Sequence, residues 1–320
     1  AAARLVQSAA EMAEAEGPPH PWAGCGAGEL VASQLPFELR VVPIKERRTC
    51  RLAFPLPSRL SQHRDSRAPV LDYVTHLLAH EGEGSLYACL QAEGLATAVS
   101  AGAEGLRDFA IAQVRIDLTP LGEERVEVVL CRVFEYLAML AEEGAGAAAR
   151  EAWAELAMER ALRWRFAERG DAAAEARSWA ARMHVYSPQL ALSGGRLLGG
   201  FPAEGVVACL EAMRPGGVLI SRESKAFQAV SPPEEDDEAD SVCVVPLPPS
   251  LPPGSQRLTE PYYGVQYERR PIASPLREKL QAARRGERMP AAGGAPALPL
   301  HLPAPNPFFA TELEMKEEGE

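Results

Sequence analysis

This 320-residue chain lacks long apolar runs and has no excess of positive charge, since 33 Lys and Arg face 44 Asp and Glu. No stretch approaches the roughly 18 apolar residues that a membrane-spanning helix needs. The chain opens Ala-Ala-Ala without the charged and apolar regions of a signal peptide, and is expected to be a piece of a longer protein. The formal net charge of -11 argues against a nucleic-acid binder, which needs a basic face. An integral membrane protein and a nucleic-acid-binding protein are therefore not expected.

Cysteine is sparse as well. The six cysteines lie at least 25 residues apart, so no C-x-x-C pair is present for a zinc knuckle or a thioredoxin-type motif. Six cysteines are too few for a disulfide-stapled scaffold of this length, and they favour reduced, mostly buried thiols in a reducing compartment. We therefore expect a cytoplasmic location.

Several catalytic signatures are missing. The glycine pairs 194–195 and 199–200 lack the G-x-G-x-x-G or G-K-[ST] context of a phosphate-binding loop, and no G-x-S-x-G marks a serine hydrolase. Neither H-E-x-x-H nor H-x-x-E-H occurs, so the chain lacks the two helical arrangements that place a general base beside a histidine zinc ligand.

Regular hydrophobic patterns fill the chain before residue 230. Strands are predicted over 40–44, 51–56, 95–102, 109–118, 218–221 and 262–267, the first two joined by a charged turn over 45–48. Helices are predicted over 4–16, 67–80, 85–94, 119–143, 147–167, 172–183 and 202–213, with Trp153, Trp164 and Trp179 as core anchors. This order predicts an α+β fold with a mostly antiparallel sheet packed against helices.

Proline and acidic residues are concentrated towards the end of the chain. Sixteen of the 28 prolines lie between Pro232 and Pro307. Residues 231–256 combine a run of acidic residues with a proline-rich stretch and show no core-forming pattern, which predicts a disordered insertion. Residues 288–305 are rich in alanine, glycine and proline and are interpreted as a linker.

One histidine pair has metal-binding spacing. His76 and His80 are four residues apart in a predicted helix, with Glu81 next to the second, so both rings share one helix face. A zinc ion would still need a third ligand and a water-activating carboxylate from elsewhere. The alternatives are ordinary histidines at a helix end, or histidines that contact a ligand.

Six short segments together are more specific than any one of them. They are Val41–Lys45 (VVPIK), Phe54–Pro57 (FPLP), His76–Leu86 (HLLAHEGEGSL), Ile116–Thr119 (IDLT), Tyr262–Tyr267 (YYGVQY) and Asn306–Phe309 (NPFF). In sequence and in order, they resemble the second domain of the pitrilysin/insulysin family of inverted-zincin metallopeptidases. Members of this family have four related α+β domains that form two halves of a closing chamber, with zinc on an H-x-x-E-H motif in the first domain.

The resemblance implies a domain organisation. Residues 1–27 would be the last helix of a preceding catalytic-type domain and a linker. Residues 28–285 would be the second, non-catalytic domain with its insertion at 231–256, and residues 286–320 would be a linker and the start of a third domain. Zinc then belongs to the complete family enzyme and not to this chain, for which no catalytic residue and no metal ligand is predicted.

The resemblance also implies a substrate exosite, which here means a peptide-binding surface away from the zinc. It would hold the amino terminus of a peptide and comprise His76, Ala79, His80, Glu81, Val99, Ser100, Ala101 and Gly102. The family tends to have a Gly-Gly step where this chain has Ala101-Gly102.

Two functions are compatible with this resemblance. One is part of a zinc metalloendopeptidase that supplies chamber wall and exosite; the other is a stand-alone, inactive peptide-binding or regulatory module. The expected partners are a peptide substrate and the remaining peptidase domains, with a homodimer possible for the full-length protein.

Overall fold

The computed structural model describes residues 35–57, 69–105, 109–168, 170–184, 186–228, 254–290 and 298–308. The helix predicted over 4–16 and residues 231–253 of the predicted disordered insertion lie outside these ranges.

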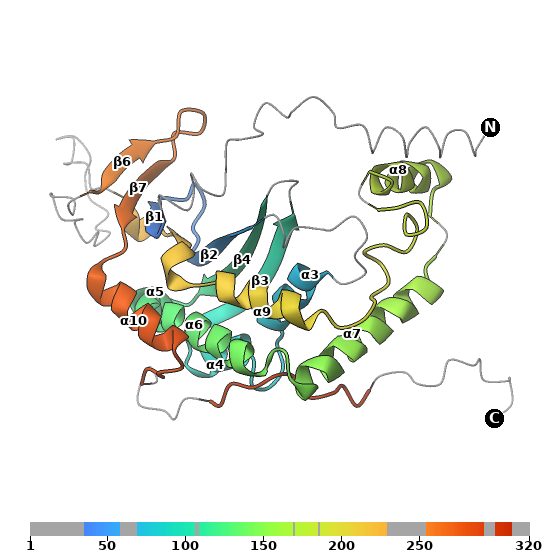
Figure 1. Ribbon diagram of the computed structural model, residues 1–320. Helices are drawn as coiled ribbons and strands as arrows, with labels where there is room; N and C mark the ends of the chain where they lie inside the picture. The colour runs from blue at the N-terminus through green and yellow to red at the C-terminus, as the bar shows by residue number, and fades with distance from the viewer. Residues whose placement is uncertain are drawn as a thin grey trace, which may run out of the picture.

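The described strands form one seven-stranded sheet with the order β3-β4-β2-β5-β1-β7-β6 (Figure 1). In this sheet β1 runs parallel to β5, and the other neighbouring strands are antiparallel. The predicted α+β fold with a mostly antiparallel sheet is therefore confirmed. The strands are β1 Phe37–Val41, β2 Thr49–Pro57, β3 Ala96–Gly105, β4 Phe109–Leu118, β5 Leu219–Glu223, β6 Gln256–Thr259 and β7 Gln266–Pro271.

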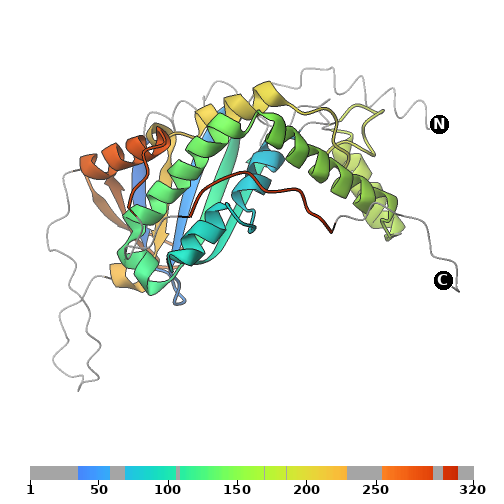
Figure 2. The same ribbon diagram turned by 90° about the horizontal axis from the view of Figure 1, so that it is seen from below.

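Helices cover one face of the sheet, and a longer helix extends past its edge (Figure 2). The layer over the sheet contains α3, α4, α6, α9 and α10, whereas α7 runs outward and has α8 beyond its far end (Figures 1 and 2). The helices are α3 Val70–Leu78, α4 Leu86–Ala92, α5 Pro120–Glu124, α6 Val126–Glu143, α7 Ala147–Arg165, α8 Ala172–Arg182, α9 Ala203–Ala212 and α10 Ser274–Arg284.

The core lies between the sheet and this helical layer. Alternate residues of β2 and β4 are buried and lie opposite one another; Leu52, for example, lies opposite Val114. An apolar stripe of α6 is buried against them, and Phe134 meets Phe54 edge-on with ring centroids 6.0 Å apart. Alternation in the strands and helical spacing in α6 thus produce matching apolar faces.

The first two strands are joined by a loop that contains residues 45–48, as predicted, and β5 lies between them in the sheet. Two local predictions are wrong. The helix predicted over 119–143 is two helices, since Arg125 leaves helical geometry between α5 and α6. Residues 262–267 are mainly the connection of the β6–β7 hairpin and not a strand, and the Tyr262 side chain is exposed there.

The tryptophan prediction is confirmed for one residue of three. Trp153 is buried, and its indole nitrogen donates a hydrogen bond of 3.0 Å to the carbonyl oxygen of Gly199. Trp164 and Trp179 are 37% and 42% exposed, because they lie on the outer half of α7 and on α8, away from the sheet. None of the helices in the described ranges combines the length and apolarity needed to cross a bilayer.

Four cysteines are expected to resist modification in the folded chain. Cys50, Cys89, Cys131 and Cys209 are free and buried, and burial raises the pKa of Cys89 to about 11 and of the other three to about 12. Because the thiolate is the reactive form, labelling with a thiol reagent at pH 8 should spare these four until denaturant is added. Mass spectrometry of the labelled native chain measures this, and modification of any of the four would contradict it.

Candidate functional site

The segment after α3 is built around His80. Ala79 ends the helix, and the backbone N–H of Gly82 donates a hydrogen bond of 3.0 Å to Nδ1 of His80. A side chain at position 82 would place its Cβ 2.5 Å from Cε1 of the His80 ring, so glycine lets the ring keep this position. Since Nδ1 accepts this bond, the neutral ring of His80 carries its proton on Nε2.

His76 and His80 line a cavity of about 320 Å³ between α3 and α7. Their rings meet edge-on with centroids 6.3 Å apart, as the four-residue spacing predicts. The opposite wall carries Glu151, Glu155 and Glu159, which recur every fourth residue on α7. The remaining wall is the extended segment Leu302–Pro305, from near the end of the described chain.

Both histidines of this cavity have lowered pKa values. His76 remains exposed, but partial desolvation by the surrounding protein lowers its pKa, and the positive charge of Arg160 adds to this effect. The carboxylates of Glu159 and Glu155 oppose it without cancelling it. Desolvation, together with the nearby His76, lowers the pKa of His80. At neutral pH both rings are therefore uncharged and able to donate one hydrogen bond each.

These residues do not fit a catalytic zinc site. No group of three His, Cys, Asp or Glu side chains in the described ranges is arranged to hold a metal ion. Nδ1 of His80 already accepts from Gly82, and Glu155 Oε2 accepts a 3.0 Å hydrogen bond from the backbone N–H of Asn306. The zinc that the resemblance implies for the complete enzyme has no place among these side chains.

The second part of the predicted site is an open sheet edge. Among the described strands, β3 is the terminal one of the sheet and pairs only with β4. Val99 is buried and Ala101 packs partly against the core, whereas Ser100 and Gly102 are exposed. The Ala101 methyl group therefore points towards the helical layer and not into the free edge of the strand.

The predicted residues are divided between two places. His76 and His80 share the cavity, with Ala79 half-buried beside them at the end of α3. Glu81 is exposed in the loop that follows and is not part of the cavity wall. The β3 residues are also outside the cavity wall, although α3 itself packs against β3.

Sequence reasoning missed the other two cavity walls. The regular spacing of the three α7 glutamates was a usable signal, because residues four apart share a helix face. Segment Leu302–Pro305 gave no such signal, since a proline-rich stretch has no hydrophobic periodicity. Its neighbour His301 fixes its position: the His301 N–H donates a hydrogen bond of 3.1 Å to the Gly84 carbonyl. Gly84 has φ of +76°, and a Cβ there would overlap the His301 ring.

Two family models match the chain. Residues 29–152 match the "Peptidase M16 inactive domain", and residues 164–320 match the "Middle or third domain of peptidase_M16". The chain belongs to the peptidase M16 family. The M16 chain carries its β1–β4 in the first matched segment and β5–β7 in the second, yet all seven strands form one sheet.

Relatives of known sequence and structure agree with this assignment. Insulin-degrading enzyme-like 1, peroxisomal, of Arabidopsis thaliana is 27% identical over 89% of this chain and 25% of its own length. Insulin-degrading enzyme of Mus musculus is 27% identical over 76% of this chain and 20% of its own length. The crystal structure of pitrilysin has the same fold, with a TM-score of 0.68 and 17% identity over 89% of this chain and 26% of that one. The chain thus spans about a quarter of the length of these relatives.

Proposed function

We propose that this chain is the non-catalytic, peptide-binding part of a zinc-dependent M16 peptidase and forms part of the wall of its chamber. The shared sheet supports treating residues 28–285 as one structural domain, because β1 is paired with both β5 and β7. Residues 1–27 and 286–320 then connect this domain to the rest of a longer peptidase, which supplies the zinc and its ligands.

The observation that carries this proposal is the outer edge of β3, which pairs with no other strand in the part of the chain that the structure describes. An edge strand has backbone N–H and C=O groups without partners, so an extended peptide can add to it as a further strand whatever its sequence. Exposed Ser100 and Gly102 leave space along one face of such a strand, and a Cβ at Gly102 would meet nothing within 4 Å. Residues Val99–Gly102 thus form the backbone-binding part of the proposed exosite.

The loop after α3 gives the bound peptide a direction. Glu81 is exposed and is followed by Gly82, so its carboxylate is accessible to the α-ammonium group of a peptide. His76 and His80, uncharged at neutral pH, offer hydrogen bonds to peptide groups without repelling that ammonium group. The exosite therefore prefers a free amino terminus over a blocked one.

Acetylating the amino terminus of a peptide is expected to weaken its binding up to about fivefold, the range of an exposed ion pair. Fluorescence anisotropy with labelled peptides measures the affinities. Glu81→Gln should remove the difference between free and acetylated peptide, whereas Glu83→Gln, which changes a nearby carboxylate of the same loop, should keep it. Equal affinities of the wild-type chain for both peptides would contradict amine recognition, and undiminished binding of a backbone N-methylated peptide would contradict strand addition.

The chain alone is expected not to hydrolyse peptides. The sequence has no H-x-x-E-H, and neither His76 nor His80 has a general base in the required helical position. A quenched fluorogenic peptide with added zinc should therefore give no turnover above the buffer rate. Turnover that a chelator abolishes, and that His76→Ala also abolishes, would show that this chain carries a catalytic centre.

A further inference from the structure

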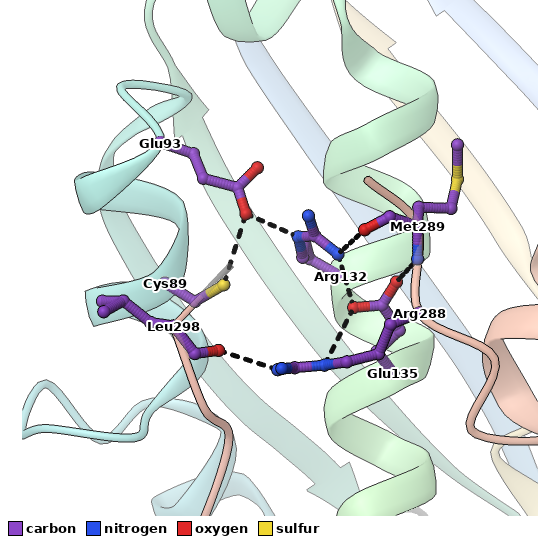
Figure 3. Close-up of polar contacts among 7 residues, drawn as sticks. All are labelled: Cys89, Glu93, Arg132, Glu135, Arg288, Met289 and Leu298. Carbon is purple, nitrogen blue, oxygen red and sulfur yellow. Dashed lines mark hydrogen bonds and ion pairs between the residues drawn. The ribbon is translucent and has the colours of Figure 1, made fainter. Parts of the chain in front are cut away.

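A buried ionic network joins three separate parts of the chain (Figure 3). Nε of Arg132 donates a hydrogen bond to Glu93 Oε1 at 2.8 Å, and Nη1 donates to Glu135 Oε2 at 2.7 Å. Arg132 lies on α6 with Glu135, and Glu93 ends α4. The side chains of Arg132, Glu93 and Glu135 are 0%, 4% and 1% exposed, so these contacts are shielded from solvent.

Such a network is expensive to bury, and ion pairs of this kind often stabilise a fold no better than apolar residues of the same size. Burial opposes the charged form of Arg132, but its hydrogen bonds to Glu93 and Glu135 outweigh this and raise its pKa. Two carboxylates face one guanidinium group, and Arg288 lies 4.0 Å from Glu135 as a second positive charge. Stability alone therefore does not explain this network, whereas a role in holding another segment of the chain in place does.

The segment that the network fixes follows α10. The backbone N–H of Met289 donates a hydrogen bond of 2.8 Å to Glu135 Oε1, and its carbonyl accepts one of 3.0 Å from Arg132 Nη1. Arg288 then donates a hydrogen bond of 2.8 Å to the carbonyl of Leu298 (Figure 3). The chain is thus attached to the same network on both sides of residues 291–297.

Beyond Leu298 the chain runs to the histidine cavity. Leu302 is buried in the core, and the backbone of His301 is bonded to Gly84 in the loop after α3. Residues 302–305 then form one wall of the cavity, and Asn306 bonds to Glu155 on the opposite helix. A shift of the attachment at residues 288–298 would therefore move the wall that faces His76 and His80.

We infer that Glu93, Arg132, Glu135 and Arg288 are positioning residues for the exosite: they hold residues 298–305 in place, so that this segment closes the histidine cavity beside the peptide-binding edge. The part of this inference that concerns peptide affinity rests on the proposed function. The part that concerns the cavity does not rest on it, because the environment of the two histidine rings can be measured without any peptide.

The experiment uses three variants of the full chain. Glu93→Gln/Arg132→Met/Glu135→Gln removes the three buried charges with side chains of similar shape. Arg288→Met removes the bond to Leu298 at a residue that is 38% exposed and therefore tolerant of change. Arg285→Met is the matched control, because Arg285 lies at the same end of α10 but pairs with the exposed Glu287. The pKa values of His76 and His80 are measured by NMR titration, and peptide affinity by anisotropy.

The triple variant loses the bond from Arg132 to the Met289 carbonyl, and Arg288→Met loses the bond to the Leu298 carbonyl. In both, the wall should loosen, more water should reach the half-buried His80, and its pKa should rise towards the ordinary histidine value. Affinity for a free-amine peptide should fall more than fivefold, with the Arg285→Met control unchanged in both measurements. An unchanged His80 pKa in folded Arg288→Met would overturn the inference, even if the triple variant does not fold. If the pKa of His80 rises but no form of the chain binds peptide, the positioning role stands and the proposed function fails.

Discussion

Replacing Arg132 alone by methionine is expected to lower the free energy of unfolding by about 3–5 kcal/mol, the cost of removing one partner from a buried ion pair. The side chains of Glu93 and Glu135 would remain 4% and 1% exposed with their shared cation gone. Each would have to stay charged without a full partner or take up a proton, and both states cost free energy. Urea denaturation followed by circular dichroism measures the loss.

The neutral triple variant is the control for this prediction. In Glu93→Gln/Arg132→Met/Glu135→Gln the two buried carboxylates are gone, and the new amide oxygen at position 135 still accepts the bond from Met289 that Glu135 Oε1 accepts. Most of the lost stability should therefore return, although Arg132 is still missing. If the single and triple variants unfold at the same urea concentration, the loss comes from packing of the Arg132 side chain and not from unpaired carboxylates.

The elements that the sequence predicted well are those determined by local patterns. β4 is found over its predicted residues, because strict alternation defines both its ends and its faces. The short helix predicted over 85–94 is present as α4, capped by Ser85, whose side chain accepts a hydrogen bond of 3.1 Å from Ala88 N. The apolar stripe of α6 is buried along its length. In each case the signal lies within a few residues of the feature.

Features that depend on distant segments were not predictable in this way. The place of β5 between β1 and β2 is a pairing across more than 150 residues, and no local pattern of the two early strands reports it. For the cavity, the spacing of His76 and His80 predicted a shared face, but not that α7 and residues 302–305 would form the other walls. Arg132 lies in a helix that was predicted from its hydrophobic pattern. Its partners Glu93 and Met289 are distant in the sequence, so no local pattern indicated a buried network.

Gly122 is a second position at which one substitution should be severe. It is the third residue of the short helix α5, and its backbone N–H donates a hydrogen bond of 2.9 Å to the Thr119 hydroxyl that caps the helix. The same Thr119 hydroxyl donates to the Gly94 carbonyl, which ties α5 to the chain between α4 and β3. A Cβ on Gly122 would overlap the Leu95 carbonyl oxygen and lie 2.8 Å from its carbon.

Gly122→Ala is therefore expected to destabilise the chain by about 1–3 kcal/mol or more, as insertion of a methyl group into a packed site does. Alanine gains up to about 1 kcal/mol over glycine in helix propensity, which offsets only part of this cost. The obstacle is backbone and not a flexible side chain: the Leu95 carbonyl already accepts a hydrogen bond of 3.1 Å from Thr119 N. The methyl group can therefore be accommodated only by moving α5 away from the start of β3.

The matched control is Gly216→Ala, where a Cβ would meet nothing within 4 Å. This exposed residue should tolerate the change within about 0.5 kcal/mol. Thermal and urea unfolding of both variants give the comparison. Because α5 abuts the start of β3, folded Gly122→Ala should also bind an extended peptide more weakly than Gly216→Ala does. Equal stability of the two variants would show that Leu95 and α5 separate at little cost, and that the start of the edge strand is not held by this contact.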